Sequence, residues 1–477
     1  MYLGIDLGTS GVKILIIDAT QNVVAEATSP VESLAVQPPY SEQNPHSWLR
    51  AIEKAFEEIK ARNPGIFGQV RGIGLSGHMH GAVLIDRHDA VLRPCIMWDD
   101  GRSHLECEEL SEAAAFERIG GNLVMAGFTA PKLRWVEKNE PEIFDKIGKV
   151  LLPKDYVRLW LTGEYAAEMS DAAGTLWLDV EKREWSQTLL EATNLSADQM
   201  PRLYEGTEVT GTVRGELCDT WGFSPGTVVA GGAGDNAAAA CGMGIVEDGA
   251  FLSLGTSGVV FAPTKAFLPN VERGVHAFCH AVPGVWHQMG VILAAASCLE
   301  WLARTMQTDV ASALNQLPQT INGPSSVCFL PYLTGVRTPH NDPRARASFN
   351  GVTNRTQNAD LVQAVLEGVG FALKDCFIAL AEGKTEITEA YAVGGGSRSQ
   401  EWLQIIANIC GVSLMIPERG EYGAAFGAAR LGMSAALEGY DAGIFSKPPV
   451  KQVVAPQADL ASAYSDAHGE FQDLYRR

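Results

Sequence analysis

Short apolar runs separated by turn-forming residues open the chain and predict β-structure. Tyr2–Asp6 and Val12–Asp18 are rich in aliphatic and β-branched residues, and the tight turn Leu7-Gly8-Thr9-Ser10-Gly11 separates them. A second turn, Ala19–Asn22, precedes another apolar run at Val23–Ala25. The pattern predicts three strands joined by hairpins.

The spacing of apolar residues then becomes helical. Asn44-Pro45 supplies an N-cap and a first-turn proline, and apolar residues recur at helical spacing from Leu49 to Ile59. Val70–Leu75 is the next strand-like run. Three strands, a helix and a further strand form an α/β pattern that differs from the strand–helix–strand opening of a dinucleotide-binding domain.

An internal repeat suggests that the chain consists of two similar domains. Leu7–Gly11 recurs letter for letter as Leu254–Gly258, and each copy closes a strand-like run. Each half also has a strand-like run that ends in paired glycines, at Gly231-Gly232 and at Gly394-Gly395-Gly396. Two repeats in the same order favour duplication over a chance match.

The repeat places a domain boundary near residues 243–249. Glycines in this segment offer the conformational freedom of a hinge. We therefore predict a first domain of residues 1–245, a second of residues 246–477, and a ligand-binding cleft between them. The tail after about residue 445 contains Lys447-Pro448-Pro449 and then polar, helix-like sequence, and we expect it to be peripheral.

Composition narrows the possible partners. The 477 residues include 56 acidic and 37 basic side chains, and the net charge of −19 argues against nucleic-acid binding. No apolar stretch reaches the ~20 residues of a membrane helix, and the N-terminus lacks a signal-peptide pattern, so a cytoplasmic protein is expected. The nine cysteines have no CxxC spacing, and neither disulfides nor a zinc site is indicated.

The repeated turns are candidates for binding phosphate. In the first, Asp6 ends a strand, Thr9 and Ser10 follow in the turn, and Lys13 comes next. Glycine lets the backbone approach a phosphate, the turn offers N–H and O–H donors, and the carboxylate can hold magnesium. The second copy contributes Gly255 and Thr256. A polar hairpin turn is the alternative interpretation, and neither copy matches GxxxxGK[ST] or GxGxxG.

Asp235 is the sharpest candidate for acid–base chemistry. Gly231–Gly234 delivers it at the end of a strand, and Asn236 and the alanine run Ala237–Ala240 follow as the start of a helix. A carboxylate there could accept a hydroxyl proton, or it could simply cap the helix. Residues alone leave these two interpretations nearly even.

Two further segments are candidates for binding a polyol. His78-Met79-His80-Gly81 follows the strand Val70–Leu75, and its histidines suit hydrogen bonds with hydroxyl groups better than a metal, since no acidic or cysteine ligand is spaced beside them. Trp98-Asp99-Asp100-Gly101-Arg102 joins an aromatic ring to hydrogen-bonding groups, as a sugar site would. The alternative for the second segment is a loop with a surface ion pair.

A third glycine-rich segment, Gly394-Gly395-Gly396-Ser397, ends a strand and precedes an amphipathic helical pattern. Glycines at this position would let a flat base or a ribose pack against the backbone. The segment is also consistent with an ordinary turn between a strand and a helix.

These motifs resemble the FGGY family of carbohydrate kinases, whose members have the actin-like, ribonuclease-H-like ATPase fold. The resemblance runs from residue 2 to about residue 430. Within the family, Met79-His80, Trp98–Arg102 and Leu152–Tyr156 are most similar to bacterial members that act on xylulose. The matching segments are, in order, Gly4–Ser10, Gly77–Gly81, Trp98–Arg102, Leu152–Tyr156, Ser170–Thr175, Gly234–Asn236, Leu254–Gly258, Leu330–Leu333, Arg337–His340, Gly394–Ser399 and Gly423–Ala429.

The resemblance implies an α/β protein of two actin-like domains with an interdomain cleft, sugar in the first domain and ATP with Mg²⁺ in the second. It implies a phosphotransferase acting on a ketopentose, D-xylulose, with Asp235 as the catalytic base and Asp6 beside the metal and the γ-phosphate. A homodimer is the assembly that relatives suggest. The implied sugar contacts are Met79, His80, Trp98, Asp235 and Asn236; the implied phosphate contacts are Thr9, Ser10, Lys13, Gly255 and Thr256; and Gly394, Gly395, Gly396 and Ser397 border the adenosine.

Two positions depart from the family pattern, and three alternatives stay open. Asn408 stands where relatives usually have an acidic residue, and Ser76-Gly77-His78 replaces an expected Gly-Gln, which makes His80 the firmer sugar contact. The substrate could be another sugar or polyol, such as ribulose, gluconate, fuculose or glycerol. A non-catalytic sugar sensor and a chaperone-like or filament-forming ATPase are the other two alternatives.

Overall fold

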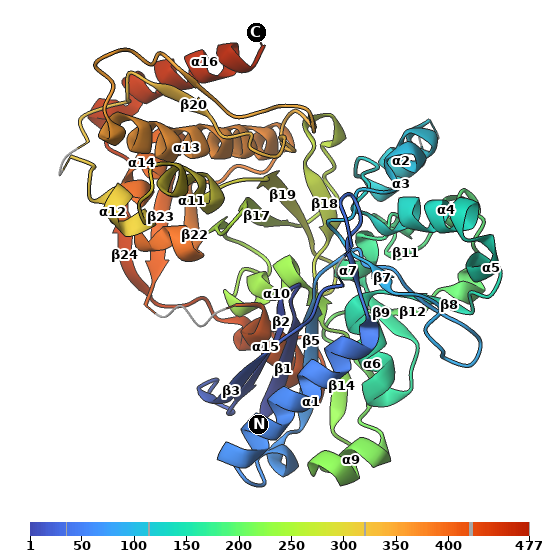
Figure 1. Cartoon of the computed structure of the whole chain (residues 1–477). Coiled ribbons are helices and arrows are strands. Elements are labelled where there is room, and N and C mark those ends of the chain that lie inside the picture. Colours follow the sequence, from blue (N-terminus) through green and yellow to red (C-terminus); the bar gives the residue numbers. More distant parts are fainter. Residues whose placement is uncertain (35, 113–114, 319–320, 419–422, 477) are drawn as a thin grey trace.

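The computed structural model describes residues 1–34, 36–112, 115–318, 321–418 and 423–476, and two mixed sheets of seven strands each dominate these residues (Figure 1). We call residues 1–245 the first half and residues 246–476 the second half. In Figure 1 the first sheet lies below, the second sheet lies above, and helix α10 lies between them.

The first sheet begins with the predicted meander. β1 pairs antiparallel with β2, β2 pairs antiparallel with β3, and β5 adds parallel to β1 after helix α1. The Asn44 side chain caps α1 by accepting from the N–H of His46 at 3.0 Å, as the sequence predicted. The strands, in spatial order, are β13 (Val209–Thr212), β14 (Val228–Ala230), β5 (Gly72–Gly77), β1 (Tyr2–Leu7), β2 (Gly11–Ile17) and β3 (Val23–Pro30), with β15 (Ala233–Gly234) also pairing with β5.

The second sheet repeats this topology, which confirms the predicted duplication. An antiparallel hairpin, β16–β17, is followed by the antiparallel β19, and β22 and β23 add parallel to β16, as β5 and β14 do to β1. Its strands, in spatial order, are β18 (His276–Cys279), β19 (Trp286–Ile292), β17 (Gly258–Thr264), β16 (Phe251–Leu254), β22 (Glu389–Val393), β23 (Ser413–Pro417) and β24 (Val450–Val454).

Helices cover both sheets, and a helical insertion of the first half, α2 to α5, stands at the right of Figure 1. Short strands form small two-stranded pairs outside the main sheets. The longer helices are α1 (Pro45–Arg62), α2 (His104–Ser111), α4 (Thr129–Asn139), α6 (Pro153–Thr162), α10 (Asp235–Gly242), α11 (Ala296–Thr305), α13 (Asn358–Glu382), α14 (Gln400–Cys410), α15 (Ala424–Ala436) and α16 (Ala461–Arg476); shorter ones include α3 (Ala115–Gly120), α5 (Pro141–Phe144) and α7 (Met169–Ala173).

Helix α15 joins the halves by packing against the first sheet, although it follows β23 of the second. Glycines bring the backbones into contact. A Cβ at Gly74 of β5 would lie 1.8 Å from the carbonyl oxygen of Ala428, and one at Gly427 would lie 1.8 Å from that of Ala238 in α10. These positions tolerate no side chain larger than hydrogen, so α10, α15 and β5 form a rigid junction beneath the cleft.

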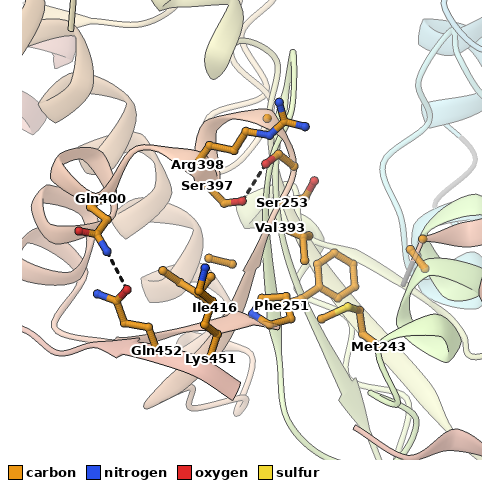
Figure 2. Close-up of a pocket in the computed structure, with 16 residues that line it drawn as sticks. Met243, Phe251, Ser253, Val393, Ser397, Arg398, Gln400, Ile416, Lys451 and Gln452 are labelled. Atoms are coloured by element: carbon orange, nitrogen blue, oxygen red, sulfur yellow. Dashed lines mark hydrogen bonds between the residues drawn. The ribbon is translucent and has the colours of Figure 1, made fainter. Parts of the chain in front are cut away.

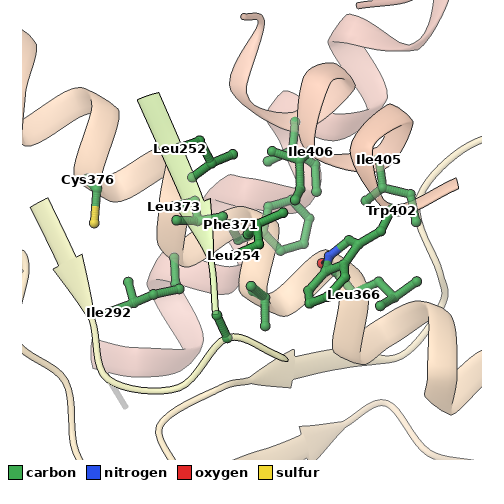
Figure 3. Close-up of a cluster of buried hydrophobic side chains, with 14 of the residues drawn as sticks. Leu252, Leu254, Ile292, Leu366, Phe371, Leu373, Cys376, Trp402, Ile405 and Ile406 are labelled. Carbon is green, nitrogen blue, oxygen red and sulfur yellow. The ribbon is translucent and has the colours of Figure 1, made fainter. Parts of the chain in front are cut away.

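The core of the second half lies between its sheet and helices α13, α14 and α16. Figure 3 shows Trp402 of α14 beside Leu254 of β16 and Leu366 of α13. The indole N–H of Trp402 donates to the carbonyl oxygen of Leu366 at 3.1 Å, so this buried polar group is satisfied.

The prediction of a peripheral tail is wrong. β24 adds a strand beside β23, and α16 buries Tyr464 and Phe471 completely in the core of the second half. Polar residues separate the buried side chains of α16 along the chain. This pattern is also typical of a helix on the protein surface. Its apolar stripe completes a core that the sheet and α13 leave open.

Candidate functional site

Parallel pairing of β1, β5 and β15 brings the predicted residues to one edge of the first sheet. Asp6 of β1 lies opposite Ser76 of β5, and Ser76 lies opposite Ala233 of β15. The segments that leave the carboxyl ends of these strands carry His80 and Asp235. This edge is where open α/β sheets bind their ligands.

A cavity of about 310 Å³ opens at this edge, between the two halves. The first half contributes residues from the loop after β5, Trp98, the helical insertion and α10, and the second half contributes residues from β16 to β19 and from the loop at Arg337. Of the predicted sugar contacts, all five line this cavity: Met79, His80, Trp98, Asp235 and Asn236.

A second cavity, of about 710 Å³, lies against the second sheet and is lined by Gly394, Gly395 and Ser397. Figure 2 shows Met243 and Phe251 on one side of it, and Ile416 and Lys451 on the other. Apolar walls flanked by the cations Arg398 and Lys451 suit a flat base carrying an anionic chain.

Gly394 must be glycine for two reasons. Its φ is +89°, and a Cβ would lie 2.7 Å from the carbonyl oxygen of Leu254. The adjacent Gly396 is buried against Trp402 and Leu254 and does not line the larger cavity. The glycine-rich segment therefore serves both the cavity and the packing of α14.

The two cavities adjoin. Ser253 of β16 lines both of them, and so does one face of α10. On that face Asp235 lines the smaller cavity, while Ala239 and Met243 line the larger one at i+4 and i+8. A group bound in the larger cavity can therefore extend toward Asp235.

Asp235 is held in a defined orientation. Its Oδ1 accepts from the backbone N–H and the Nδ2 of Asn236, at 2.7 and 2.9 Å. Burial raises the pKa of Asp235 to about 6, the bond from the Asn236 backbone opposes this rise, and the Asp6 charge adds to it. The carboxylate is ionised at neutral pH, yet it is more basic than an ordinary aspartate.

Asp6 lies half-buried near the same edge, and the Ser76 hydroxyl donates to its Oδ1 at 2.9 Å. Burial raises the pKa of Asp6, while the bond from Ser76 and the charge of Lys13 lower it. Within the described ranges no three His, Cys, Asp or Glu side chains are grouped to hold a metal by themselves. A carboxylate oxygen at a phosphate-sized turn fits Mg²⁺ that arrives bound to phosphates.

His80 presents a single acceptor to the smaller cavity. Its Nδ1 lies 2.7 Å from the carbonyl oxygen of Gly174, and a carbonyl can only accept, so Nδ1 carries the proton and Nε2 is bare. Burial lowers the pKa of His80 to about 3, which keeps the ring neutral. The backbone here is left-handed, with φ +70°, and Lys132 supports it by donating to the His80 carbonyl oxygen at 2.8 Å.

Helix α6, which contains most of the Leu152–Tyr156 motif, and the Ser170–Thr175 motif support the strand end that leads to Asp235. Fully buried Arg158 of α6 donates to the carbonyl oxygens of Ala230 and Gly231, at 2.5 and 2.6 Å. The Ser170 hydroxyl accepts from the N–H of Gly234 at 3.0 Å. These bonds fix the strand end that delivers Asp235, since buried backbone groups need such partners.

Two carbonyl oxygens of each repeated turn accept hydrogen bonds, at the third and fourth residues of the pentapeptide in the first turn and at the second and third residues in the second turn. The carbonyl oxygens of Thr9 and Ser10 accept from Gln43 Nε2 and the Val31 N–H, at 2.7 and 3.0 Å. In the second turn, those of Gly255 and Thr256 accept from the N–H groups of Ala296 and Ala295, at 2.9 and 2.8 Å. Within the described chain, the N–H groups of these four turn residues donate no hydrogen bond.

Several predicted residues lie near the cavities without lining them. Thr9 Oγ1 accepts from Trp98 Nε1 at 3.0 Å, which ties the first turn to the indole. Lys13 forms an ion pair with Glu26 at 3.0 Å. Gly255 lines the smaller cavity, whereas the predicted residues outside both lining sets are Asp6, Thr9, Ser10, Lys13, Thr256 and Gly396.

The two departures from the family pattern have different surroundings. His78 lines the smaller cavity and packs edge-on against Trp48, and neither of its ring nitrogens has a hydrogen-bond partner in the described structure. Asn408 lines neither cavity. Its Nδ2 donates to Gln457 Oε1 at 2.9 Å and its Oδ1 accepts from the Gln457 N–H at 2.8 Å, so Asn408 anchors the C-terminal tail.

Sequence reasoning missed several lining residues. Phe128 comes from the helical insertion, and His276 and Arg337 come from the second half. Arg337-Thr338-Pro339-His340 was noted as a motif, but no periodicity or spacing indicated which ligand it faces. None of the helices in the described ranges combines the length and apolar character needed to span a bilayer.

Comparisons with known proteins extend over nearly the whole chain. Models of the N-terminal and C-terminal domains of the FGGY family of carbohydrate kinases match residues 1–242 and 250–436. Xylulose kinase of Escherichia coli (strain K12) is 46% identical over 481 residues, covering 100% of this chain and 99% of that protein.

Solved structures show the same architecture. A crystal structure described as a xyloylose kinase from Brucella ovis has a TM-score of 0.98 and 52% identity, covering 100% of this chain and 98% of that one. Xylulose kinase from Rhodospirillum rubrum has a TM-score of 0.89 and 25% identity, with coverage of 100% and 98%. The predicted fold class is therefore confirmed, and the chain belongs to the FGGY family of carbohydrate kinases, with their two-domain, actin-like ATPase fold.

Proposed function

We propose that this chain transfers the γ-phosphate of ATP to O5 of D-xylulose, giving D-xylulose 5-phosphate and ADP. The observation that carries the proposal is the junction of the two cavities, where α10 presents Asp235 to the smaller cavity and Ala239 and Met243 to the larger one. Full-length similarity to xylulose kinases supports this choice of sugar.

Asp235 is the proposed general base. The Asn236 bonds orient its carboxylate, and the elevated pKa of about 6 makes it a better proton acceptor while it remains ionised at neutral pH. The 5-hydroxyl gives its proton to this carboxylate as its oxygen attacks phosphorus. Phosphoryl transfer of this kind depends mainly on positioning and on stabilisation of charge.

The sugar lies in the smaller cavity. His80 Nε2 accepts from one hydroxyl, because Gly174 holds the proton on Nδ1. Trp98, which is 43% exposed, offers the face of its indole to C–H groups, and Met79 supplies an apolar wall. Asn236 lines the same cavity beside the base.

The nucleotide lies in the larger cavity, with the adenosine beside Gly394, Gly395, Gly396 and Ser397. The N–H groups of Thr9, Ser10, Gly255 and Thr256, which donate to no described residue, are the proposed phosphate donors. Lys13 reaches a phosphate only by leaving its exposed ion pair with Glu26, a contact of the type that contributes little.

Asp6 is the proposed site for Mg²⁺, either directly or through water. One oxygen is oriented by Ser76, and the carboxylate ends β1 at the first turn. When bound, the metal would neutralise charge on the phosphates. Homodimerisation and a cytoplasmic location stay predictions from the sequence.

The test is ADP release measured across pentuloses and polyols, together with binding of D-xylulose to Asp235→Asn. We expect D-xylulose to give the highest kcat/KM, and Asp235→Asn to bind the sugar while kcat falls by about 10²–10⁴. Full activity in Asp235→Asn, or loss of both binding and turnover, would contradict the assigned role. ATP turnover that is indifferent to sugars would contradict the whole function.

A further inference from the structure

Arg337 is a cation of the second half that lines the smaller cavity without an acidic partner. No carboxylate of the described chain lies within ion-pair distance of it. Its hydrogen bond is with His276, where Nη1 lies 3.2 Å from Nε2. Burial lowers the pKa of Arg337 to about 10, so the guanidinium is still charged at neutral pH.

A chain of hydrogen bonds fixes the direction of this guanidinium. Asn122 Nδ2 donates to the carbonyl oxygens of Gly120 and Ala277, at 2.8 and 2.9 Å, so its Oδ1 faces His276. His276 Nδ1, 3.1 Å from that oxygen, must carry the proton, and its Nε2 must accept from Arg337. The remaining N–H groups of Arg337 are therefore oriented by a neutral network and are available to a ligand.

Donors and acceptors are divided between the halves. Asp235 and His80 Nε2, both from the first half, can only accept. Arg337, from the second half, can only donate. Hydroxyl groups satisfy the two acceptors. A group that can only accept, such as a carbonyl oxygen, is the natural complement of the guanidinium.

The chemistry of the proposed substrate supplies that group. A 2-ketopentose closes to a five-membered ring only by adding its own O5 to C2. In the ring O5 carries no proton, and it cannot be phosphorylated there. Transfer to O5 therefore requires the open chain, which exposes a ketone oxygen at C2.

We propose that Arg337 recognises the C2 carbonyl oxygen of the open-chain ketose and thereby makes the enzyme select ketoses over the corresponding polyols. This inference rests on the proposed function. The base and His80 belong to the first half and Arg337 to the second, so the sugar contacts both sides of the cleft through its two ends. Asn122 and His276 act through Arg337, as positioning residues.

The first experiment compares D-xylulose with xylitol and D-arabitol, its two reduction products at C2, in wild type and Arg337→Met. The variant should lose roughly 10- to 100-fold in kcat/KM and in affinity for D-xylulose, the range expected for a hydrogen bond to a charged group. Affinity for the polyols, measured by calorimetry, should change less than about threefold, since no carbonyl is lost. Arg344→Met, an exposed arginine of the same loop, is the matched control.

The possible outcomes distinguish a failure of the Arg337 inference from a failure of the proposed kinase function. Equal losses for ketose and polyol, in a variant that still binds ADP, would overturn the role of Arg337 and leave the kinase activity standing. A wild-type chain that does not phosphorylate D-xylulose would overturn both. Exogenous guanidinium should restore part of the D-xylulose activity of Arg337→Met, which a purely structural defect would not allow.

A second experiment does not depend on the variant folding. D-Xylulose labelled with ¹³C at C2 is bound to wild-type protein without nucleotide and followed by NMR. The inference predicts a bound ketone resonance, shifted downfield by the charged donor. A bound signal only in the hemiketal region would overturn it.

Discussion

The two halves share one turn sequence and one topology, yet they carry different chemistry. In both turns the carbonyl oxygens face the protein, and the N–H groups of Thr9, Ser10, Gly255 and Thr256 donate to no described residue. The difference lies in the residue before each turn, which is Asp6 in the first half and Ser253 in the second. The two copies thus share the turn sequence and differ in the side chain at the strand end.

The strands next to the turns differ in the same way. Ser76 of β5 lies opposite Asp6, whereas Val393 of β22 lies opposite Ser253 and leads into Gly394. At these strand ends the first half thus supplies a carboxylate, and the second supplies an uncharged residue that leads into glycine. This asymmetry suits a reaction in which an anionic chain from one side meets a base from the other.

The largest expected effect concerns stability, because α16 completes the core of the second half. Phe471→Ala should lower the free energy of unfolding by about 3–5 kcal/mol, through lost burial and a cavity. Chemical denaturation monitored by tryptophan fluorescence measures this. Leu105→Ala, at a side chain that is 60% exposed in the first half, should change stability by less than about 0.5 kcal/mol. A loss in Phe471→Ala as small as that in Leu105→Ala would show that packing of α16 contributes little to stability.

Asp6→Ser makes the first turn resemble the second. We expect kcat to fall by about 10²–10³, because the substitution removes the carboxylate proposed to hold the metal. Steady-state kinetics with saturating D-xylulose and Mg-ATP provide the measurement. The exposed Asp459 is a suitable control, and Asp459→Ser should keep wild-type kcat. An Asp6→Ser enzyme with near-normal kcat would remove the functional contrast between the turns.

Ser253→Asp is the converse change, and it makes the second turn resemble the first. A carboxylate between the two cavities should repel the phosphates and raise the KM for ATP about tenfold, since a unit charge a few ångströms away contributes ~1–4 kcal/mol near a surface. The Kd for D-xylulose without nucleotide should change far less. Ser253→Asn adds similar bulk without charge, and equal effects from both variants would point to crowding instead.

The smallest predicted effect concerns pH. Asp235 acts only when ionised, and its raised pKa of about 6 means that kcat/KM should fall as pH decreases through 6, by about tenfold at pH 5. The Asn236 side-chain bond lowers this pKa, so Asn236→Ala should move the acid limb to higher pH. A pH–rate profile checks both the position and the direction. A flat profile between pH 5 and 7 would exclude Asp235 as the titrating base.

Much of the fold and part of the site could be predicted because local sequence determines them. Asp235 and Gly394 come directly after short apolar strands, where parallel pairing must expose them. The repeated pentapeptide allowed the duplication to be predicted, because the conformation of a hairpin turn depends on the few residues of the turn itself.

What sequence reasoning missed depends on long-range packing. Arg337 lies 102 residues beyond Asp235 in the chain and reaches the same cavity because the next residue, Thr338, exchanges hydrogen bonds with the backbone of Val291 in β19. Lys132 has no motif of its own, yet its ammonium group donates to the carbonyl oxygens of His80 and Gly127, at 2.8 and 2.7 Å. The prediction for the tail was wrong for the same reason. The apolar residues of α16 can be identified as core residues only once α13 and α14 are seen to pack against them.

Helix α10 sets the distance between the two cavities. From Asp235 to Met243, the residue that caps the helix, the chain advances eight residues, about 12 Å at 1.5 Å per residue, and residues four apart lie on neighbouring parts of one side. In the proposed function, the position of the nucleotide is thus tied to the position at which a sugar hydroxyl meets the carboxylate. Gaining or losing one residue within this helix would turn its far end by about 100° and misalign the two cavities.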